Sequence, residues 1–341
     1  MGLRGKLALS LVERSLPARM SADAMEGLPD GLHVFMVGTG APLPDPGRSQ
    51  PSVGVVAGGR LFLVDAGEGT ASALNACQLD PGRIECVILT HFHSDHIGGL
   101  PAVAIQRWVS DRRSDRLRVL GPKGVKRVAK GLNRAYSLDS QYRAAHHGEE
   151  VAPLELGGLV PERFDAGSKL ESEVIIDDGG VKVTAFTVDH TPVDPALGIR
   201  FDYQGRSVVS SGDTTYTESL VKAAEGADLL ICDALSPELV GLLEKTSREI
   251  GRPRRAKIFS DIPSYHSSPQ QAARMASEAG VKNLALTHII PPLPLKALEG
   301  PFLGNSREIF SGPLWLAEDG DLYTLLPGGS KVERSRVPRP R

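Results

Sequence analysis

The stretch "THFHSDHIGG", Thr90–Gly99, places three histidines and an aspartate within six positions of a chain that has nine histidines in 341 residues. It follows the apolar run "IECVIL", which is typical of a buried strand. Core packing gains nothing from grouping four polar side chains that are costly to bury. Neutral imidazole and carboxylate are zinc's usual non-sulfur ligands, so the stretch predicts a metal site.

The spacing within this stretch divides its ligands into two sets. Alternate side chains of an extended segment point the same way, so His91 and His93 can bind one metal. After the chain turns, Asp95 and His96 face a second metal. Gly98-Gly99 follows at the start of a helix, where backbone is expected to pass close to the site.

Other strand-like segments also end in a histidine or an aspartate, and five such endings are present: Asp65, His91–His96, His190, Asp213 and His288. In a layered α/β protein, sites form at strand ends because loops converge there. We therefore expect these residues to share one pocket. Asp213 has two carboxylate oxygens and could bridge metals roughly 3.5–4 Å apart, the spacing of two-metal hydrolases.

The rest of the pattern predicts an α/β fold with mostly buried sheets, because short apolar runs alternate with helical stretches from Leu32 onward. Helices are expected over 70–78, 99–109, 124–133, 218–225 and 269–279. We expect an N-terminal helical extension at 1–31 and a hydrolase domain at 32–328. Within that domain 141–173 is expected to be a long loop, and 329–341 a flexible tail.

Composition narrows the class of protein. Apolar residues make up 41% and charged residues 23% of the chain, values of an ordinary globular protein. Three scattered cysteines exclude a disulfide framework and favour the cytoplasm, with the periplasm as the alternative. No segment is long and apolar enough to be a transmembrane helix. The first twenty residues are interpreted as an amphipathic helix for packing or for a homodimer contact, with membrane association as the alternative.

"THFHSDHIGG" resembles the signature of the metallo-β-lactamase superfamily, and the resemblance extends from Gly38 to about Leu326. "GTGAPLPDPGR", "VDAGEGT", "SSGDTTYTESLVKAAEGADLLICDA" and "YHSSPQQAARMASEAGVKNLALTH" resemble the branch that contains ribonuclease Z and arylsulfatase-like enzymes. The resemblance implies a four-layered αββα sandwich with two metals at one edge.

The resemblance also implies a role for each ligand. One metal would lie on His91, His93 and His190, and the other on Asp95, His96 and His288, with Asp213 bridging them. Asp65 matches the structural aspartate that braces the ligand loop. Two Zn²⁺ ions suit the imidazole-rich donors, with iron or manganese as alternatives.

His266, in "YHSSPQQ", matches a histidine that lies near the reactive centre in this branch, so we expect it to exchange a proton with the substrate. It could instead be a residue that precedes a helix whose N-cap is Ser267 or Ser268. The partner carboxylate in ribonuclease Z is a glutamate, whereas this chain has the shorter Asp233.

The expected reaction is hydrolysis of an ester by metal-bound hydroxide, which Asp95 would orient. The leading hypothesis is a small sulfate ester or phosphodiester as substrate, because the chain has no long arm rich in glycine and proline of the kind that ribonuclease Z carries. Opening of a lactone or β-lactam is one alternative. Endonucleolytic processing of the tRNA 3′ end is another.

Nucleic acid is the less favoured partner, because a net charge of −2 gives no general attraction to RNA. One segment, by contrast, favours RNA binding. Residues 112–134 hold nine basic residues against the single Asp115, and such a run could contact phosphates. Arg48 is a further candidate for substrate contact, although its spacing does not establish this role.

Overall fold

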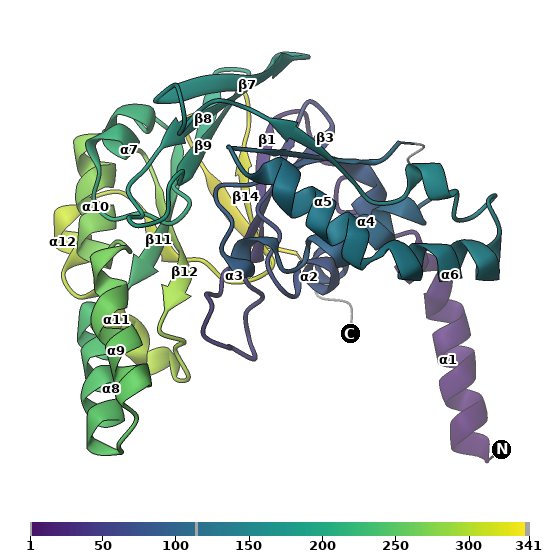
Figure 1. Ribbon diagram of the computed structural model, residues 1–341, viewed down its shortest axis with the longest axis horizontal. Helices are drawn as coiled ribbons and strands as arrows, with labels where there is room; N and C mark the ends of the chain where they lie inside the picture. Colours follow the sequence, from purple (N-terminus) through teal and green to yellow (C-terminus); the bar gives the residue numbers. More distant parts are fainter. Residues whose placement is uncertain (1, 113–114, 338–341) are drawn as a thin grey trace.

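The computed structural model describes residues 2–112 and 115–337, and its centre is a pair of β-sheets (Figure 1). The first sheet has the strand order β15-β14-β1-β2-β3-β4-β5-β6. In chain order its strands are β1 (Leu32–Gly38), β2 (Ser52–Ala57), β3 (Arg60–Val64), β4 (Ile84–Ile88), β5 (Leu117–Gly121), β6 (Leu159–Arg163), β14 (Asp321–Leu325) and β15 (Glu333–Arg336).

The second sheet has the order β13-β12-β11-β10-β9-β8-β7. Its strands are β7 (Ser172–Asp178), β8 (Val181–Thr187), β9 (Leu197–Tyr203), β10 (Arg206–Ser210), β11 (Leu229–Leu235), β12 (Leu284–Ile290) and β13 (Leu314–Leu316). Strands β3 to β6 of the first sheet run parallel, as do β10 to β13 of the second. The carboxyl ends of neighbouring parallel strands therefore meet at one edge.

The main core lies between the two sheets. Val34, Val55 and Phe62 of the first sheet pack with Ile199 and Phe201 of the second, and all five side chains are buried. The rings of Phe62 and Phe201 meet across the interface with 5.8 Å between their centroids. This contact joins the two sheets directly, as expected of aromatic side chains in a sandwich core.

Helices cover the outer face of each sheet and complete four layers. The first sheet is covered by α2 (Thr70–Ala76), α4 (Leu100–Trp108) and α5 (Val125–Ala135). The second is covered by α7 (Glu218–Ala223), α10 (Pro269–Glu278), α11 (Glu299–Leu303) and α12 (Ser306–Ile309). The predicted αββα sandwich is confirmed, and the five predicted helices are present within two residues of their expected bounds.

The prediction of a long loop at 141–173 is wrong. This region contains the C-terminal part of α6 (Ser137–His147), a 3-10 turn at Leu154–Leu156, β6 and the start of β7. Helix α6 buries none of its side chains, so it has no apolar stripe from which the sequence could reveal it. An ion pair of 2.8 Å between Asp139 and Arg143, one turn apart, supports it instead.

The flexible tail predicted at 329–341 is also wrong for its first part. Strand β15 pairs antiparallel with β14, and Arg334 forms a 2.8 Å ion pair with Asp321. All four residues of β15 are exposed, so the strand is held by backbone pairing and lacks the apolar alternation that would predict it. Residues 338–341 lie outside the described residues.

Helix α1 (Leu3–Met20) extends away from the sandwich, as Figure 1 shows. Its apolar side chains stay exposed, including Leu3 (85%) and Leu7 (63%), so the expected packing against the body is not observed. The homodimer contact stays a prediction. Among the described residues, no helix has the length and apolar character needed to cross a membrane.

Candidate metal centre

The seven predicted ligands come together at the edge where the strands of both sheets end. They form two groups, His91, His93, His190 and Asp213, and Asp95, His96, Asp213 and His288. Within each group the candidate ligand atoms lie within 4.8 Å of one another. The first sheet supplies the loop after β4 and the short helix α3 (Ser94–Ile97), and the second supplies the rest. Asp213 belongs to both groups.

Asp65 lies behind this cluster and orients two of its histidines. Its carboxylate accepts a hydrogen bond from His96 Nδ1 at 2.8 Å, and others from the Thr90 amide at 2.9 Å and the Thr90 hydroxyl at 2.7 Å. Because the Thr90 hydroxyl donates to Asp65, its oxygen can accept from His91 Nδ1 at 3.1 Å. Both imidazoles therefore donate from Nδ1 and turn Nε2 toward the cluster, so Nε2 is the nitrogen that could bind a metal.

His190 is oriented in the same way from the second sheet. Its Nδ1 donates to the backbone carbonyl of Tyr265 at 2.7 Å, which leaves Nε2 facing His93 Nδ1 at 3.3 Å. Burial lowers the pKa of His190 to about 4, so this imidazole is neutral at pH 7. A neutral imidazole is the form that binds a metal.

Asp213 is the shared centre of the arrangement. Its Oδ2 lies 3.3 Å from Nε2 of His96 and 3.3 Å from Nε2 of His288, and also within 4 Å of His91 and His190. Burial opposes ionisation here, but His288 and His96 together lower the pKa of Asp213 well below its usual range. Asp213 is therefore a carboxylate, the form in which an aspartate can bind a metal.

His288 reaches the site through an irregularity in β12. The pairing with β11 runs from Asp233–Thr287 directly to Ala234–Ile289, so His288 is an extra residue in the ladder. Its φ of +49° is unusual for a residue other than glycine, as in a β-bulge beside a site. Its Nε2 lies 3.2 Å from Asp95 Oδ2. The sequence predicts His288 at a strand end, whereas it lies within the strand.

The donor set fits a metal. His96 Nε2 is buried and makes no hydrogen bond, although buried nitrogens in proteins are normally paired. His91 Nε2 lies 3.0 Å from His93 Nδ1, so two imidazole nitrogens face each other directly. A bound cation accounts for both observations, because it accepts the lone pairs of all these nitrogens together.

Gly99 allows the ligand loop to approach the strand that carries Asp65. A Cβ on Gly99 would lie 2.0 Å from the carbonyl oxygen of Gly67, a contact that no side chain could make. The Gly99 amide donates to Ala66 O at 2.8 Å, directly after Asp65. This position agrees with the close backbone approach expected from the sequence.

His266 and Asp233 form a pair beside the cluster. His266 Nδ1 lies 3.0 Å from Asp233 Oδ2, and both side chains are buried. The two residues also form a third group of candidate metal ligands with Asp213. Burial raises the pKa of Asp233. The N-cap of α10 is Ser268, whose side chain accepts from Gln271 N, so His266 is not itself the cap.

Two contributors were not predicted from the sequence. Thr90 links Asp65 to His91, and Tyr265 supplies the carbonyl that orients His190, with its ring 5.3 Å from the His190 ring. Thr90 precedes the ligand motif, which is the one signal that could have identified it. The role of Tyr265 depends on a backbone atom and leaves no mark in the sequence.

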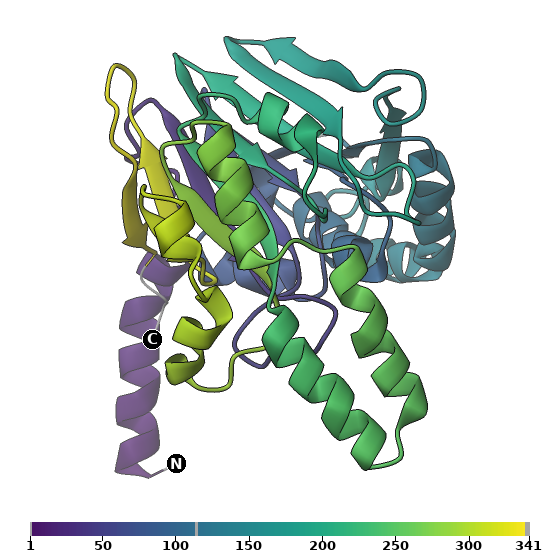
Figure 2. The ribbon, with the colours of Figure 1, turned by 90° about the vertical axis from the view of Figure 1, so that its left-hand side faces the viewer.

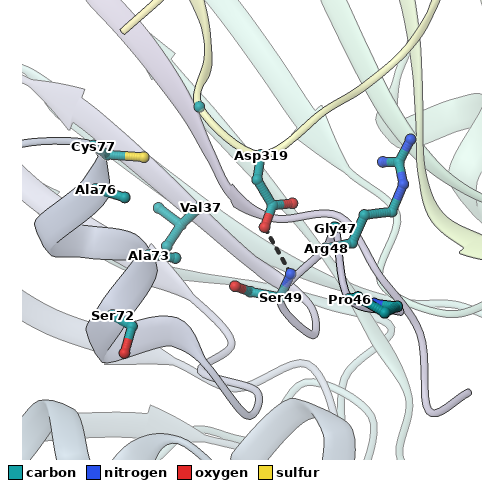
Figure 3. Close-up of a pocket in the computed structure, with 11 residues that line it drawn as sticks. Val37, Pro46, Gly47, Arg48, Ser49, Ser72, Ala73, Ala76, Cys77 and Asp319 are labelled. Carbon is teal, nitrogen blue, oxygen red and sulfur yellow. Dashed lines mark hydrogen bonds between the residues drawn. The ribbon is translucent and has the colours of Figure 1, made fainter. Parts of the chain in front are cut away.

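Arg48 does not contact the metal cluster. Its guanidinium donates to Thr39 Oγ1 and to the Ala317 carbonyl, each at 2.5 Å, so it fixes the chain between β1 and β2. It lines a cavity of about 250 Å³ on the outer side of the first sheet. Figure 3 shows this cavity between Ser49, which donates to Asp319, and α2. None of the predicted metal ligands lines it.

The comparisons with known proteins agree with this geometry. The model of the metallo-beta-lactamase superfamily matches residues 46–261, more than half of the chain. The chain belongs to the metallo-beta-lactamase superfamily. It is similar to a ribonuclease Z of Mycobacterium avium, with 36% identity over 290 residues that make up 84% of this chain and 96% of that protein.

Solved structures place this member of the superfamily in the same branch. Human tRNase Z, short form, is 25% identical and superposes with a TM-score of 0.59 over 85% of this chain and 98% of its own. The metallo-beta-lactamase fold protein YhfI from Bacillus subtilis is 19% identical. It superposes with a TM-score of 0.64 over 87% of this chain and 100% of its own, which supports the fold. The chain is thus a metal-dependent hydrolase of the ribonuclease Z branch, with a cluster of histidine and aspartate residues able to hold metal ions.

Proposed function

We propose that this hydrolase cleaves phosphodiester bonds in RNA and acts as an endonuclease on precursor tRNA. The relatives named ribonuclease Z, at 34–37% identity over 85–97% of their length, support this substrate better than the small sulfate or phosphate ester of the leading hypothesis. The observation in this chain that carries the proposal is the position of a basic helix beside the metal centre.

That helix is α5. Its exposed side chains include Lys123, in the turn before it, and Lys126, Arg127, Lys130 and Arg134 within it. In the part of the chain that the structure describes, none of these five cations forms an ion pair, and 116–138 contains no acidic residue. Unpaired cations on one face of a helix are typical of a surface that binds phosphates.

The start of α5 rests on the ligand loop. A Cβ on Gly124 would lie 2.6 Å from the ring of Phe92, the residue between His91 and His93. The basic face therefore begins beside His91 and His93, two of the proposed ligands. One RNA backbone could contact the basic face and the metal centre together. A net charge of −2 does not oppose this arrangement, because the local field decides where a polyanion binds.

The site residues would then divide the chemistry as follows. We propose that His91, His93 and His190 hold one metal and that Asp95, His96 and His288 hold the other, with Asp213 between them. Zinc is the proposed metal, because imidazole nitrogens predominate. When bound, two such metals supply a nucleophile at neutral pH and neutralise charge on the phosphate. Asp65 holds the ligand imidazoles of His91 and His96 in one tautomer.

His266 is proposed to protonate the leaving oxygen. The bond to Asp233 occupies Nδ1, so Nε2 is the atom that can exchange a proton with a substrate. Asp233 orients the ring and stabilises its protonated form. The carboxyl group is one methylene shorter than the glutamate in the family's motif, yet the 3.0 Å distance shows that it reaches His266.

The test is a substrate panel on protein of known metal content. We expect precursor tRNA to be cleaved with a kcat/KM above that of aryl sulfates, lactones and β-lactams, and a chelator to abolish the cleavage. Replacing Lys123, Lys126 and Arg127 by glutamine should weaken RNA binding and lower its salt dependence. Efficient turnover of an aryl sulfate or a lactone, with RNA left intact, would overturn the proposal.

A further inference from the structure

A helical hairpin separates the two members of the proton-transfer pair in the sequence. Helix α8 (Pro237–Glu249) begins four residues after Asp233, and α9 (Pro253–Asp261) ends five residues before His266. The chain therefore leaves the site at one member of the pair and returns at the other. The sequence patterns did not predict either helix.

The base of the hairpin is fixed to the site edge. Val240 of α8 and Phe259 of α9 are buried with Leu235, Ile262 and Ile290. Next to them, the Leu235 amide donates to Ser267 O at 2.8 Å and the Ser236 amide to Ile290 O at 2.8 Å. The same buried cluster includes Ala41, in the loop after β1. The hairpin is thus a rigid continuation of the second sheet.

The tip of the hairpin extends well beyond the sheets. Figures 1 and 2 show α8 and α9 side by side, projecting from the end of the sandwich at which α3 lies. At about 1.5 Å per helical residue, α8 places its C-terminal end about 20 Å from Ser236. The tip and the metal centre are therefore at the same end of the molecule but well separated.

The tip carries three unpaired arginines. Arg252, Arg254 and Arg255 are exposed, and among the described residues none of them forms an ion pair. Cations on the sides of the hairpin differ, since Arg248 pairs with Glu244 at 2.6 Å. Lys257 pairs in the same way with Asp261 at 2.5 Å. The positive charge of the hairpin is left available at the tip alone.

We propose that the α8–α9 hairpin is an RNA-binding arm and that its tip arginines bind the phosphate backbone of the substrate at a distance from the bond that is cleaved. This inference rests on the proposed function. Guanidinium groups suit the role because each can bind a phosphate through two parallel hydrogen bonds. With α5 beside the ligand loop, the arm gives the substrate a second, remote point of attachment.

The experiment compares two triple variants of the full-length, metal-loaded protein. In the first, Arg252, Arg254 and Arg255 are replaced by glutamine. In the matched control, glutamine replaces three exposed lysines that lie outside the hairpin: Lys182 on β8, Lys222 on α7 and Lys331 before β15. Each variant is assayed with a precursor tRNA and with bis(4-nitrophenyl) phosphate, which is too small to reach the tip.

In the arginine variant, we expect kcat/KM for precursor tRNA to fall at least about tenfold more than kcat/KM for the small phosphodiester. Its slope of log(kcat/KM) against log[salt] should become shallower by about 2–3, since each lost phosphate contact removes nearly one released counterion. The lysine variant should keep the wild-type slope. Thermal denaturation of both variants checks that the fold is intact.

Two results would overturn the inference, and they can be told apart. If wild-type protein cleaves precursor tRNA and the arginine variant keeps both its rate and its salt slope, the arm does not bind RNA, while the proposed function stands. If wild-type protein neither binds nor cleaves RNA, the proposed function fails and the arm fails with it.

Discussion

His96 donates its Nδ1 proton to Asp65 at 2.8 Å, and this one hydrogen bond decides which nitrogen the imidazole turns toward Asp213. Through Thr90, the same carboxylate also sets the orientation of His91. Asp65 thereby controls one candidate ligand from each of the two metal-binding groups without entering either group. Carboxylates behind metal-binding histidines act in this way, since they fix the tautomer and raise ligand basicity.

Replacing Asp65 by asparagine should therefore weaken metal binding by about 10- to 100-fold. An amide can no longer accept from His96 and Thr90 as a carboxylate does, so both ligands lose their fixed orientation. Metal content after dialysis against graded chelator concentrations measures the effect. Asp178, which is exposed at the end of β7, provides the control for the same chemical change. Equal metal retention by wild type and the Asp65→Asn variant would contradict the assigned role.

Removal of metal should destabilise the fold. A bound cation would pair with the lone pairs of several buried imidazoles and carboxylates, and a ligand that binds only the native state adds RT ln(1 + [L]/Kd) to its stability. At a free metal concentration of about 100 Kd this is about 2.7 kcal/mol. Thermal denaturation with and without added zinc tests it. An Asp213→Ala variant should show a much smaller shift, and an unchanged Tm in the wild type would argue against a structural contribution of the metals.

Replacing His266 by alanine should lower kcat by about 10²- to 10⁴-fold, the usual contribution of a general acid, without reducing metal content. Its ring approaches Asp213 only at 4.0 Å, whereas it bonds Asp233 at 3.0 Å. The rate of precursor tRNA cleavage and the metal content are measured on the same sample. The comparison distinguishes a loss of the chemical step from a loss of bound metal. A loss of metal that parallels the loss of rate would instead identify His266 as a ligand.

Asp233→Asn should act through His266, as expected of a positioning residue. The amide keeps the approximate shape but cannot stabilise the protonated ring, so the limb of the pH–rate profile that requires protonated His266 should move to lower pH. Asp233→Glu should keep that limb at its wild-type position. Identical pH profiles in wild type and the asparagine variant would show that Asp233 contributes only to packing and not to proton transfer by His266.

Cys86 offers a pH test that is independent of the site. Burial raises the pKa of its thiol from the ordinary 9.0 to about 12, so the folded chain keeps this proton longer than the unfolded chain does. Between about pH 9 and 12 the unfolded state therefore loses the proton first, and stability falls by about 1.4 kcal/mol per pH unit for this group. Cys86→Ala should make the decline shallower by that amount in urea denaturation. The same slope in both proteins would contradict the burial effect.

The sequence predicts the fold and most of the site because both depend on local patterns. Buried strands such as β1 and β11 are mostly apolar, and the polar residues at or near the ends of such strands mark the edge where loops converge. His288 shows where such reasoning stops, since its bulge arises from the pairing of β11 with β12 and not from its neighbours in sequence. Helix α6 and strand β15 have no buried apolar face, so periodicity could not reveal them. Tyr265 contributes a carbonyl, which every residue has.

The division of the metal centre between two sheets has a consequence for biosynthesis. His91 and Asp95 leave the ribosome early, but His288 follows only after almost the whole sandwich has been translated. A partly made chain therefore lacks the residues that close the second cation cage. Hydrolytic activity should therefore emerge only when the polypeptide is nearly finished, and an incomplete chain should have none.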